Sequence, residues 1–150
     1  MSLPGIAQFD LTDRLALITG GSGGMGIEVA KLLKQEGAHP FLTDLDPAAL
    51  EKADAQLGGT AGTMAADLTD TGDIARLKDR LAELGGCDIL VHAAGVTGAK
   101  GDPLEMTDDD WMEAWEIDFM SAVRLSRALV PGMVDKGWGR VVFVTSENAV

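Results

Sequence analysis

The sequence lacks tyrosine, contains one cysteine and two histidines, and has half as many basic as acidic side chains. The formal net charge of −12 repels nucleic-acid backbones and anionic membrane surfaces. Cys87 has no second cysteine with which to form a disulfide, and it precedes an apolar run, which favours a small core residue over a nucleophile. With His39 and His92 as the two histidines and no Cys/His cluster, a metal site lacks support. We therefore expect no nucleic-acid partner and no metal.

Long apolar runs are also missing. No window approaches the length of a membrane span, and the start, MSLPGIAQFDLTD, has no basic segment followed by an apolar stretch. The single cysteine fits a reducing compartment. We therefore expect a soluble, cytoplasmic protein without a membrane partner.

A chain of 150 residues with 46% hydrophobic content can bury one sizeable core, so one domain over residues 1–150 is the default.

Apolar runs of strand length alternate with helical patterns. The runs lie at residues 14–19, 39–43, 62–66, 87–93 and 140–145. The first and last are apolar with almost no alternation, which is typical of strands buried on both faces of a parallel sheet. Helical patterns over 25–36 and 73–84 end at glycines, Gly37 and Gly85-Gly86. The alternation predicts an α/β fold with a doubly wound parallel sheet.

The segment from Thr107 to Lys136 is the longest predicted helix. Thr107 and Asp110 have the spacing of an N-terminal capping pair. The apolar positions of this helix cover more than one face, so we expect it to pack on the sheet and also on a neighbouring helix, in this chain or in another subunit: Ile117, Phe119, Met120, Val123, Leu125 and Leu129. This pattern favours a homo-oligomer, a dimer or a tetramer.

The stretch TGGSGGMG, residues 19–26, follows the first apolar run and leads into a helix. A strand that ends in glycines before a helix presents backbone N–H groups and the positive end of the helix dipole, which suits a pyrophosphate. An ordinary tight turn is the alternative. Three glycine spacings fit equally well on the residues alone: Gly21/Gly23/Gly26, Gly20/Gly23/Gly26 and Gly20/Gly24/Gly26.

An acidic residue about twenty positions further on, at the end of the next strand, is expected to bind a ribose hydroxyl. Asp46 directly precedes Pro47 and is interpreted as a helix N-cap, which leaves Asp44 for the ribose. A carboxylate there repels a 2′-phosphate, and no Lys or Arg stands in the glycine loop or directly after Asp44. The sequence therefore favours NAD over NADP.

Four motifs in order resemble the short-chain dehydrogenase/reductase family in its one-domain form, from Leu11 onward. They are TGGSGGMG at 19–26 for TGxxxGxG, ADL at 66–68, HAAG at 92–95 for NNAG, and GRVVFVTS at 139–146. The resemblance selects the Gly20/Gly24/Gly26 spacing. It implies a Rossmann fold with strands in the order 3-2-1-4-5, and an NAD(P)-dependent transfer of hydride between nicotinamide and a small secondary alcohol or ketone.

The resemblance also implies the site residues. Asp67 and Leu68 border the adenine, Ala93 to Gly95 line the cofactor through their backbone, and Ser146 orients the substrate oxygen. The cofactor-binding set is then Gly20, Ser22, Gly23, Gly24, Met25, Gly26, Asp44, Asp67, Leu68, Ala93, Ala94 and Gly95. From the residues alone, Ser146 is a hydroxyl at the carboxyl end of an apolar strand, where such sheets bind ligands, or a strand-end or cap serine.

The chain departs from the family pattern at three points. Asp118 stands where the family has a catalytic asparagine, so either burial protonates it or the proton relay is wired differently. His92 replaces the first asparagine of NNAG, and we interpret it as a strand-end histidine with a backbone partner. The YxxxK motif that supplies the family's acid is absent.

Without that motif, residues 1–150 are interpreted as the cofactor-binding portion of a longer chain, inactive alone. A non-catalytic nucleotide-binding or interaction module is the rival interpretation. A methyltransferase is a weaker third, because its cofactor has no pyrophosphate.

Overall fold

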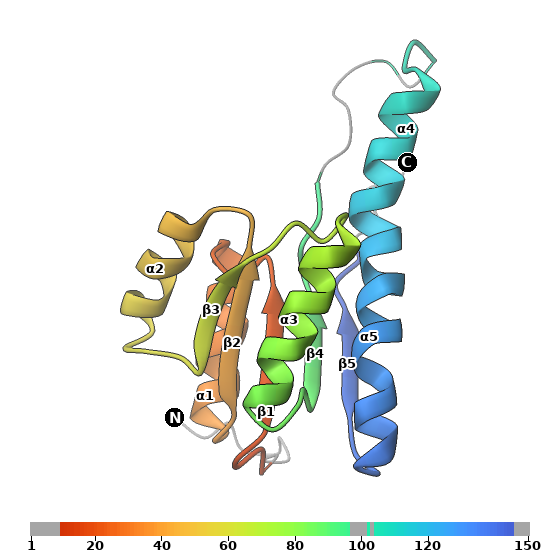
Figure 1. The fold of residues 1–150 in the computed structure, drawn as a ribbon. Coiled ribbons are helices and arrows are strands. Elements are labelled where there is room, and N and C mark those ends of the chain that lie inside the picture. Colours follow the sequence, from red (N-terminus) through yellow and green to blue (C-terminus); the bar gives the residue numbers. More distant parts are fainter. Residues whose placement is uncertain (1–9, 97–101, 103, 146–150) are drawn as a thin grey trace, which may run out of the picture.

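The computed structural model describes residues 10–96, 102 and 104–145, which contain a five-stranded parallel sheet in the order β3-β2-β1-β4-β5 (Figure 1). The elements in chain order are β1 (Leu15–Thr19), α1 (Gly24–Gln35), β2 (His39–Asp44), α2 (Pro47–Gln56), β3 (Gly62–Ala65), α3 (Thr71–Glu83), β4 (Ile89–His92), α4 (Asp108–Ala114), the π-helical segment η1 (Trp115–Met120), α5 (Ser121–Asp135) and β5 (Arg140–Phe143). The predicted fold class and strand order are confirmed.

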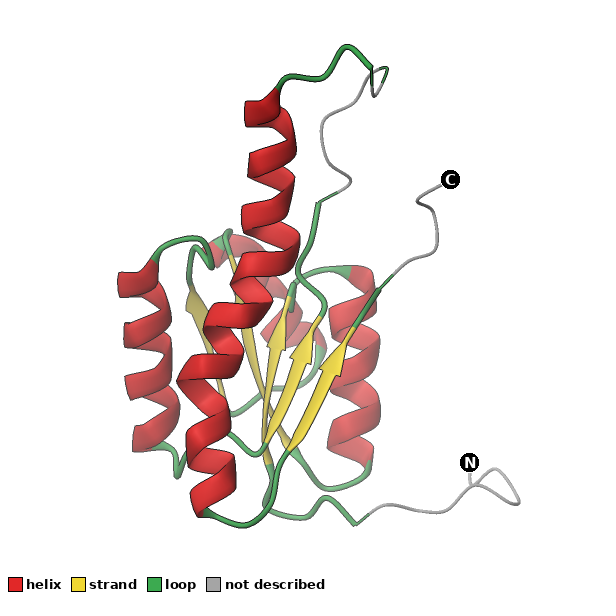
Figure 2. Cartoon of the chain, turned by 90° about the vertical axis from the view of Figure 1, so that its right-hand side faces the viewer, coloured by secondary structure: helices red, strands yellow, loops and turns green. Residues whose placement is uncertain are grey.

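Helices cover both faces of the sheet (Figure 2). Alternate residues of β1 point to opposite faces, because successive side chains of a strand alternate. Leu15 and Leu17 belong to the core formed with α3 and α5, whereas Ala16 and Ile18 belong to the core formed with α1 and α2. All five residues of β1 are buried, as the unbroken apolar run predicts.

Cys87 is a core residue, as predicted. It is 5% exposed in the cluster with α3 and α5, and burial raises the pKa of its thiol to about 11. A thiol with so high a pKa stays protonated at neutral pH and is a poor nucleophile. The interpretation of Cys87 as a small apolar residue is therefore confirmed.

Local signals predict where the helices begin and end. Asp46 caps α2 by accepting a hydrogen bond from the amide of Ala48 at 2.9 Å. Thr107 and Asp110 form the predicted capping box at the start of α4. Gly37 has φ of +90° directly after the end of α1, a conformation that favours glycine.

The predicted helix over 107–136 is not one regular α-helix. It continues from α4 through the π turn η1 into α5. At the end of η1, the hydroxyl of Ser121 donates to the carbonyl oxygen of Ile117, four residues earlier. A serine that bonds back to the preceding turn competes with the ordinary helical hydrogen bond and bends helices. Hydrophobic periodicity does not report such a local change.

The apolar side chains of this helix differ in burial along its length. Leu125 and Leu129 are buried against the core shared with α3, as expected. By contrast, Trp115 and Phe119 stack at 4.2 Å between ring centroids while about half exposed, and Trp111 is 54% exposed. Within the described residues, the second apolar face is therefore uncovered. No helix in this part of the chain is both long and apolar enough to cross a membrane.

Candidate functional site

The glycine loop between β1 and α1 disfavours a side chain at three of its positions: Gly20, Gly26 and Gly21, where a Cβ would lie 2.8 Å from the Cβ of Leu42. Gly20 has φ of +63°, and a Cβ on it would lie 3.0 Å from the carbonyl oxygen of Ala93. A Cβ on Gly26 would overlap the carbonyl oxygen of Gly20. Gly24 differs, because a Cβ there meets nothing within 4 Å. The loop is closed within the protein at Gly20 and Gly26 and open at Gly24.

The N-terminus of α1 is the open end of this loop. Side chains of Asp46, Asp70 and Thr107 cap α2, α3 and α4. The N-cap of α1 is Gly23, which has no side chain to accept a hydrogen bond, and its first turn contains no acidic residue. The first amides of a helix lack intrahelical partners and carry partial positive charge. This end of α1 is therefore free to bind an anion.

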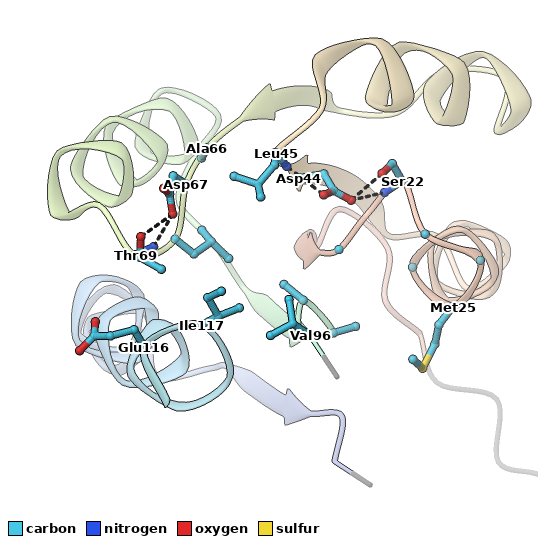
Figure 3. A pocket seen from close by; sticks show the side chains of 18 of the residues that line it. Ser22, Met25, Asp44, Leu45, Ala66, Asp67, Thr69, Val96, Glu116 and Ile117 are labelled. Atoms are coloured by element: carbon cyan, nitrogen blue, oxygen red, sulfur yellow. Dashed lines mark hydrogen bonds between the residues drawn. The ribbon is translucent and has the colours of Figure 1, made fainter. Parts of the chain in front are cut away.

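Asp44 ends β2 beside the glycine loop (Figure 3). One carboxylate oxygen accepts hydrogen bonds from the hydroxyl of Ser22 at 2.5 Å and from its amide at 3.2 Å. The other oxygen accepts from the amide of Leu45 at 2.8 Å. The carboxylate is half-buried, and its two oxygens have further lone pairs. Asp44 thus holds the loop in place and keeps capacity for another donor.

Asp67 lies just beyond β3, the strand that pairs with β2, and lines the same cavity (Figure 3). Its carboxylate accepts from the hydroxyl of Thr69 at 2.7 Å and from the amide of Thr69 at 2.8 Å. These two hydrogen bonds lower the pKa of Asp67, the hydroxyl contributing most. The side chain is exposed and stays ionised at neutral pH.

The cavity that Asp44 and Asp67 line has a volume of about 830 Å³, within the roughly 300–1,000 Å³ typical of ligand sites. All twelve residues predicted to bind cofactor line it: Gly20, Ser22, Gly23, Gly24, Met25, Gly26, Asp44, Asp67, Leu68, Ala93, Ala94 and Gly95. Seven further residues line the cavity and were not predicted from the sequence: Leu45, Ala66, Thr69, Val96, Glu113, Glu116 and Ile117. The last three share a helix face by their i, i+3, i+4 spacing, a signal that was present in the sequence.

His92 at the end of β4 does not have the backbone partner that we expected. Its two ring nitrogens contact hydroxyls instead, Thr19 Oγ1 at 2.9 Å and Ser121 Oγ at 3.0 Å. Thr19 also accepts hydrogen bonds from the amides of Ala93 and Ala94, at 3.1 and 3.0 Å. The prediction was wrong because these hydroxyls come from two distant segments. Among the described residues, no group of three or more His, Cys, Asp or Glu is arranged to hold a metal ion.

Asp118 lies on η1, next to the cavity wall. Its Oδ1 accepts from the amide of Val96 at 2.8 Å, and a Cβ on Gly95 would lie 3.1 Å from the same oxygen. The side chain is exposed, so protonation by burial, one of the two alternatives for Asp118, has no basis here. The contact needs only an acceptor, which the Oδ1 of Asp118 supplies. Ser146, the other predicted catalytic residue, lies outside the described residues.

These features fit a dinucleotide. The uncapped start of α1 suits a pyrophosphate, and the space at Gly24 allows the group to approach the backbone. Asp44 is an acceptor at the strand end where a ribose hydroxyl binds. The cavity lies at the carboxyl ends of β1, β2 and β4, the usual ligand edge of such sheets.

Comparisons with known proteins agree with this arrangement. The family described as short chain dehydrogenase matches residues 14–150. The chain belongs to this family.

Particular relatives and structures show the same likeness. An uncharacterized oxidoreductase of Bacillus subtilis (strain 168), YvrD, is 36% identical over 145 residues, which are 95% of this chain and 55% of that protein. NAD+-bound xylitol dehydrogenase has a TM-score of 0.84 at 27% identity, covering 92% of this chain and 55% of the other. L-Sorbose reductase from Gluconobacter frateurii, in complex with NADPH and L-sorbose, has a TM-score of 0.84 at 33% identity, covering 91% and 54%. The chain thus spans about half the length of the proteins that it matches.

Proposed function

We propose that residues 1–150 form the cofactor-binding Rossmann domain of an NAD(P)-dependent oxidoreductase, as a portion of a longer single-domain chain. The complete protein transfers hydride between nicotinamide and the reacting carbon of a small secondary alcohol or ketone. The observation that carries this proposal is one cavity in which the open start of α1, the open space at Gly24 and the carboxylate of Asp44 converge.

NAD is the cofactor that we propose, in preference to NADP. Among the described residues that line the cavity, none is Lys or Arg and four are acidic: Asp44, Asp67, Glu113 and Glu116. A 2′-phosphate beside Asp44 meets repulsion and no compensating cation. Family membership alone does not decide between the two, since one similar structure holds NAD+ and another NADPH.

The residues then take separate roles. The glycine loop binds the pyrophosphate, and Asp44 accepts from the ribose. Asp67 and Leu68 border the adenine. When bound, the dinucleotide supplies or accepts the hydride. The backbone of Ala93 to Gly95 lies where β4 ends and lines the cavity, where it would contact the bound cofactor.

For the chemistry, Ser146 orients the substrate oxygen. Asp118 stands in the family's asparagine position, where its carboxylate holds the amide of Val96 and contributes an acceptor to the proton relay. A phenolic acid is not available in these 150 residues, which contain no tyrosine. General acid catalysis requires a group within hydrogen-bond reach of the reacting oxygen. We therefore propose that residues 1–150 alone are inactive and that the acid comes from further along the protein.

The uncovered aromatic face of α4 and η1 supports a homo-oligomer, a dimer or a tetramer. Trp111, Trp115 and Phe119 expose about half of their surface there. Contiguous aromatic surface of this kind marks protein interfaces. The lone buried cysteine fits a reducing compartment, so we propose the cytoplasm as the location.

The proposal is tested on the protein expressed from its native gene. Binding of NAD+ and of NADP+ is measured by calorimetry, and turnover of NADH with a panel of small ketones by absorbance. Asp44→Ala should weaken NAD+ binding by about tenfold to a hundredfold, as expected for loss of hydrogen bonds to a charged acceptor. Asp46→Ala is the matched control, because Asp46 caps α2 and does not line the cavity.

Each outcome selects one interpretation. NAD+ binding with turnover of a ketone supports the oxidoreductase. NAD+ binding without turnover of any substrate favours the rival binding module. Absence of binding to either dinucleotide overturns the proposal as a whole.

A further inference from the structure

A chain of hydrogen bonds passes through the ring of His92 and joins the cavity wall to the π turn. His92 is 4% exposed, and both of its ring nitrogens have a hydroxyl within 3.0 Å, Thr19 on one side and Ser121 on the other. Thr19 ends β1, and Ser121 begins α5 directly after η1. The proton positions in this chain follow from counting donors and acceptors at each end.

At the first end, the hydroxyl oxygen of Thr19 already accepts two hydrogen bonds, from the amides of Ala93 and Ala94. A hydroxyl has two acceptor lone pairs and one proton. With both lone pairs engaged, Thr19 has its proton left to donate, and Nδ1 of His92 lies 2.9 Å away. Nδ1 must therefore be the unprotonated nitrogen.

The second end gives the same answer independently. The hydroxyl of Ser121 donates to the carbonyl oxygen of Ile117, so its single proton is used. Its oxygen can then only accept from Nε2 of His92, 3.0 Å away. Nε2 must carry the proton. Both ends define one neutral form of the ring, with the proton on Nε2.

We propose that His92 is a positioning residue which, as the neutral Nε2–H imidazole, holds the Ala93–Ala94 wall of the cavity and the η1–α5 junction in one arrangement through Thr19 and Ser121. The consequence for cofactor binding rests on the proposed function. The wall contributes the backbone of Ala93 and Ala94 to the cavity, and the junction follows the turn that carries Asp118.

Protonation of His92 is incompatible with this arrangement. A protonated Nδ1 becomes a donor toward Thr19, whose oxygen has no free lone pair unless Ala93 or Ala94 releases it. Burial lowers the pKa of His92, and the charge of Asp118 on η1 opposes that shift. On the β5 side, the ring meets Phe143 edge-on, and on the β1 side it meets Thr19. The ring is therefore neutral at neutral pH, and the cavity wall loosens in acid.

A histidine at position 92 can contact two hydroxyls, whereas the family's asparagine can contact one. The nitrogens of an imidazole lie on opposite sides of the ring and reach two hydroxyls from different segments. An asparagine amide is shorter: it can take the place of Nδ1 beside Thr19 but does not extend to Ser121. The departure from NNAG at residue 92 thus adds a link to α5, and makes that link sensitive to pH.

The first test is the protonation state itself, measured on the full-length protein with ¹⁵N-labelled histidine by two-dimensional NMR. The signals of His92 and His39 are identified by their loss in His92→Asn and His39→Asn. We expect the neutral form with Nε2 protonated at pH 7. A proton on Nδ1 at that pH overturns the proposal, and this result does not depend on cofactor.

The second test measures how pH affects the wall and the cofactor. In the full-length wild type, the hydrogen-exchange protection of the Ala93 and Ala94 amides should fall as the pH drops from 7 through the lowered pKa of His92. The dissociation constant of NAD+ should rise about threefold to tenfold over the same range, as expected for losing a hydrogen bond. His39→Asn is the control and should keep both profiles, because its side chain is exposed and away from the cavity.

His92→Asn should flatten both profiles, since an amide accepts from Thr19 but does not titrate in this range. If His92 had only a structural role, His92→Asn would lower the stability of the protein without changing either pH profile. If His92→Asn is folded and keeps the wild-type profiles, the proposal is wrong. If NAD+ does not bind at any pH, the proposed function fails, while the ring tautomer and the exchange of Ala93 and Ala94 still decide the role of His92.

Discussion

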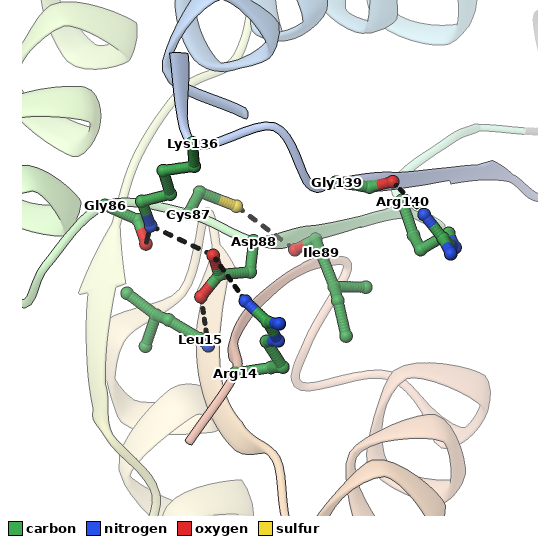
Figure 4. A network of polar contacts seen from close by, with 9 residues as sticks. All are labelled: Arg14, Leu15, Gly86, Cys87, Asp88, Ile89, Lys136, Gly139 and Arg140. Carbon is green, nitrogen blue, oxygen red and sulfur yellow. Dashed lines mark hydrogen bonds and ion pairs between the residues drawn. The ribbon is translucent and has the colours of Figure 1, made fainter. Parts of the chain in front are cut away.

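Asp88 directly precedes a strand and Asp44 ends one, so the two aspartates lie at opposite ends of the parallel strands. Asp88 precedes β4 at the amino edge and is buried. It accepts from the amide of Leu15 at 3.0 Å and from Lys136 Nζ at 2.9 Å, partners that lie 73 and 48 residues away in sequence (Figure 4). Asp44 is half-buried at the carboxyl edge, and two of its three hydrogen bonds come from Ser22 in the glycine loop.

The amino edge is closed by further contacts of the same kind. Two guanidinium groups lie over the ring of Trp138. That of Arg14 is 4.0 Å from the ring centroid, and that of Arg140 is 4.8 Å from it. Arg14 also lies 3.8 Å from Asp88. These contacts join the starts of β1, β4 and β5, whereas the carboxyl edge keeps an uncapped helix and an open cavity. The amino edge therefore serves stability and the carboxyl edge serves binding.

The largest effect is expected from a methyl group in the glycine loop. Gly26→Ala forces a Cβ against the carbonyl oxygen of Gly20, so we expect a loss of about 3 kcal/mol in the free energy of unfolding and no measurable NAD+ binding. Gly24→Ala is the matched variant, with nothing within 4 Å of its Cβ. It should keep or slightly raise stability and still weaken NAD+ binding, because the methyl group enters the cavity.

Chemical denaturation and calorimetry separate the two variants. If Gly24→Ala binds NAD+ as tightly as the wild type, the open position at Gly24 is not the approach path for the ligand. If Gly26→Ala is fully stable, the close approach of Gly20 is not a constraint on the fold.

The next effect belongs to the amino edge. Asp88→Ala leaves the buried amide of Leu15 without its acceptor and Lys136 without its ion pair. We expect a loss of about 2 kcal/mol in the free energy of unfolding, reduced from the value for a fully buried pair because Lys136 is a third exposed. The dissociation constant of NAD+ should stay within twofold of the wild type.

Asp79→Ala is the control for that variant, since Asp79 is exposed on α3 and should have little effect on stability. Equal losses of NAD+ affinity and stability in Asp88→Ala would show that the two edges are coupled. That result would contradict their separation.

The smallest effect concerns the low pKa of Asp67. Thr69→Ala removes the hydroxyl that contributes most to lowering this pKa, so the pKa of Asp67 should move up toward its ordinary value. In the wild type, the folded state binds the proton less readily than the unfolded state. The stabilisation that these hydrogen bonds give to the folded state is therefore complete above the pKa that Asp67 has in the unfolded chain. It is lost as the pH falls through the lower pKa of Asp67 in the folded protein. A carboxyl NMR titration measures the shift, and an unchanged pKa would contradict the assigned cause.

Much of the fold follows from local sequence signals. The run from Leu15 to Thr19 predicts a fully buried strand, and Asp46 before Pro47 predicts a cap, because each signal depends on neighbouring residues. The glycine loop is predicted in the same way. The partners of His92 are not predicted by local signals, because Thr19 and Ser121 contact it only through tertiary structure. Short-range patterns contain no information about such contacts.

The candidate site likewise has features that the sequence predicts and features that it does not. The positions of Gly20, Gly24 and Asp44 could be predicted, whereas the occupation of Asp44 by Ser22 could not. That Asp44 binds a ribose hydroxyl stays a prediction, and it omits the hydrogen bonds that the carboxylate already makes. The exposure of Asp118 was likewise undetermined, since it depends on how the η1 turn lies beside Val96.

The π turn makes the length of one segment as important as its composition. Its hydrogen bonds span one residue more than those of an α-helix. Deleting a single residue between Trp115 and Asp118 would allow an ordinary helix to form, and α4 would keep nearly the same orientation relative to α5, because the wider turn already absorbs the extra residue. Ser121 would still face His92, while the spacing of Trp115 and Phe119 would shorten from four residues to three and their ring stacking would change. Homologous chains can therefore keep the course of this helix and still differ in the aromatic surface that they present to a partner, through a change of one residue in length.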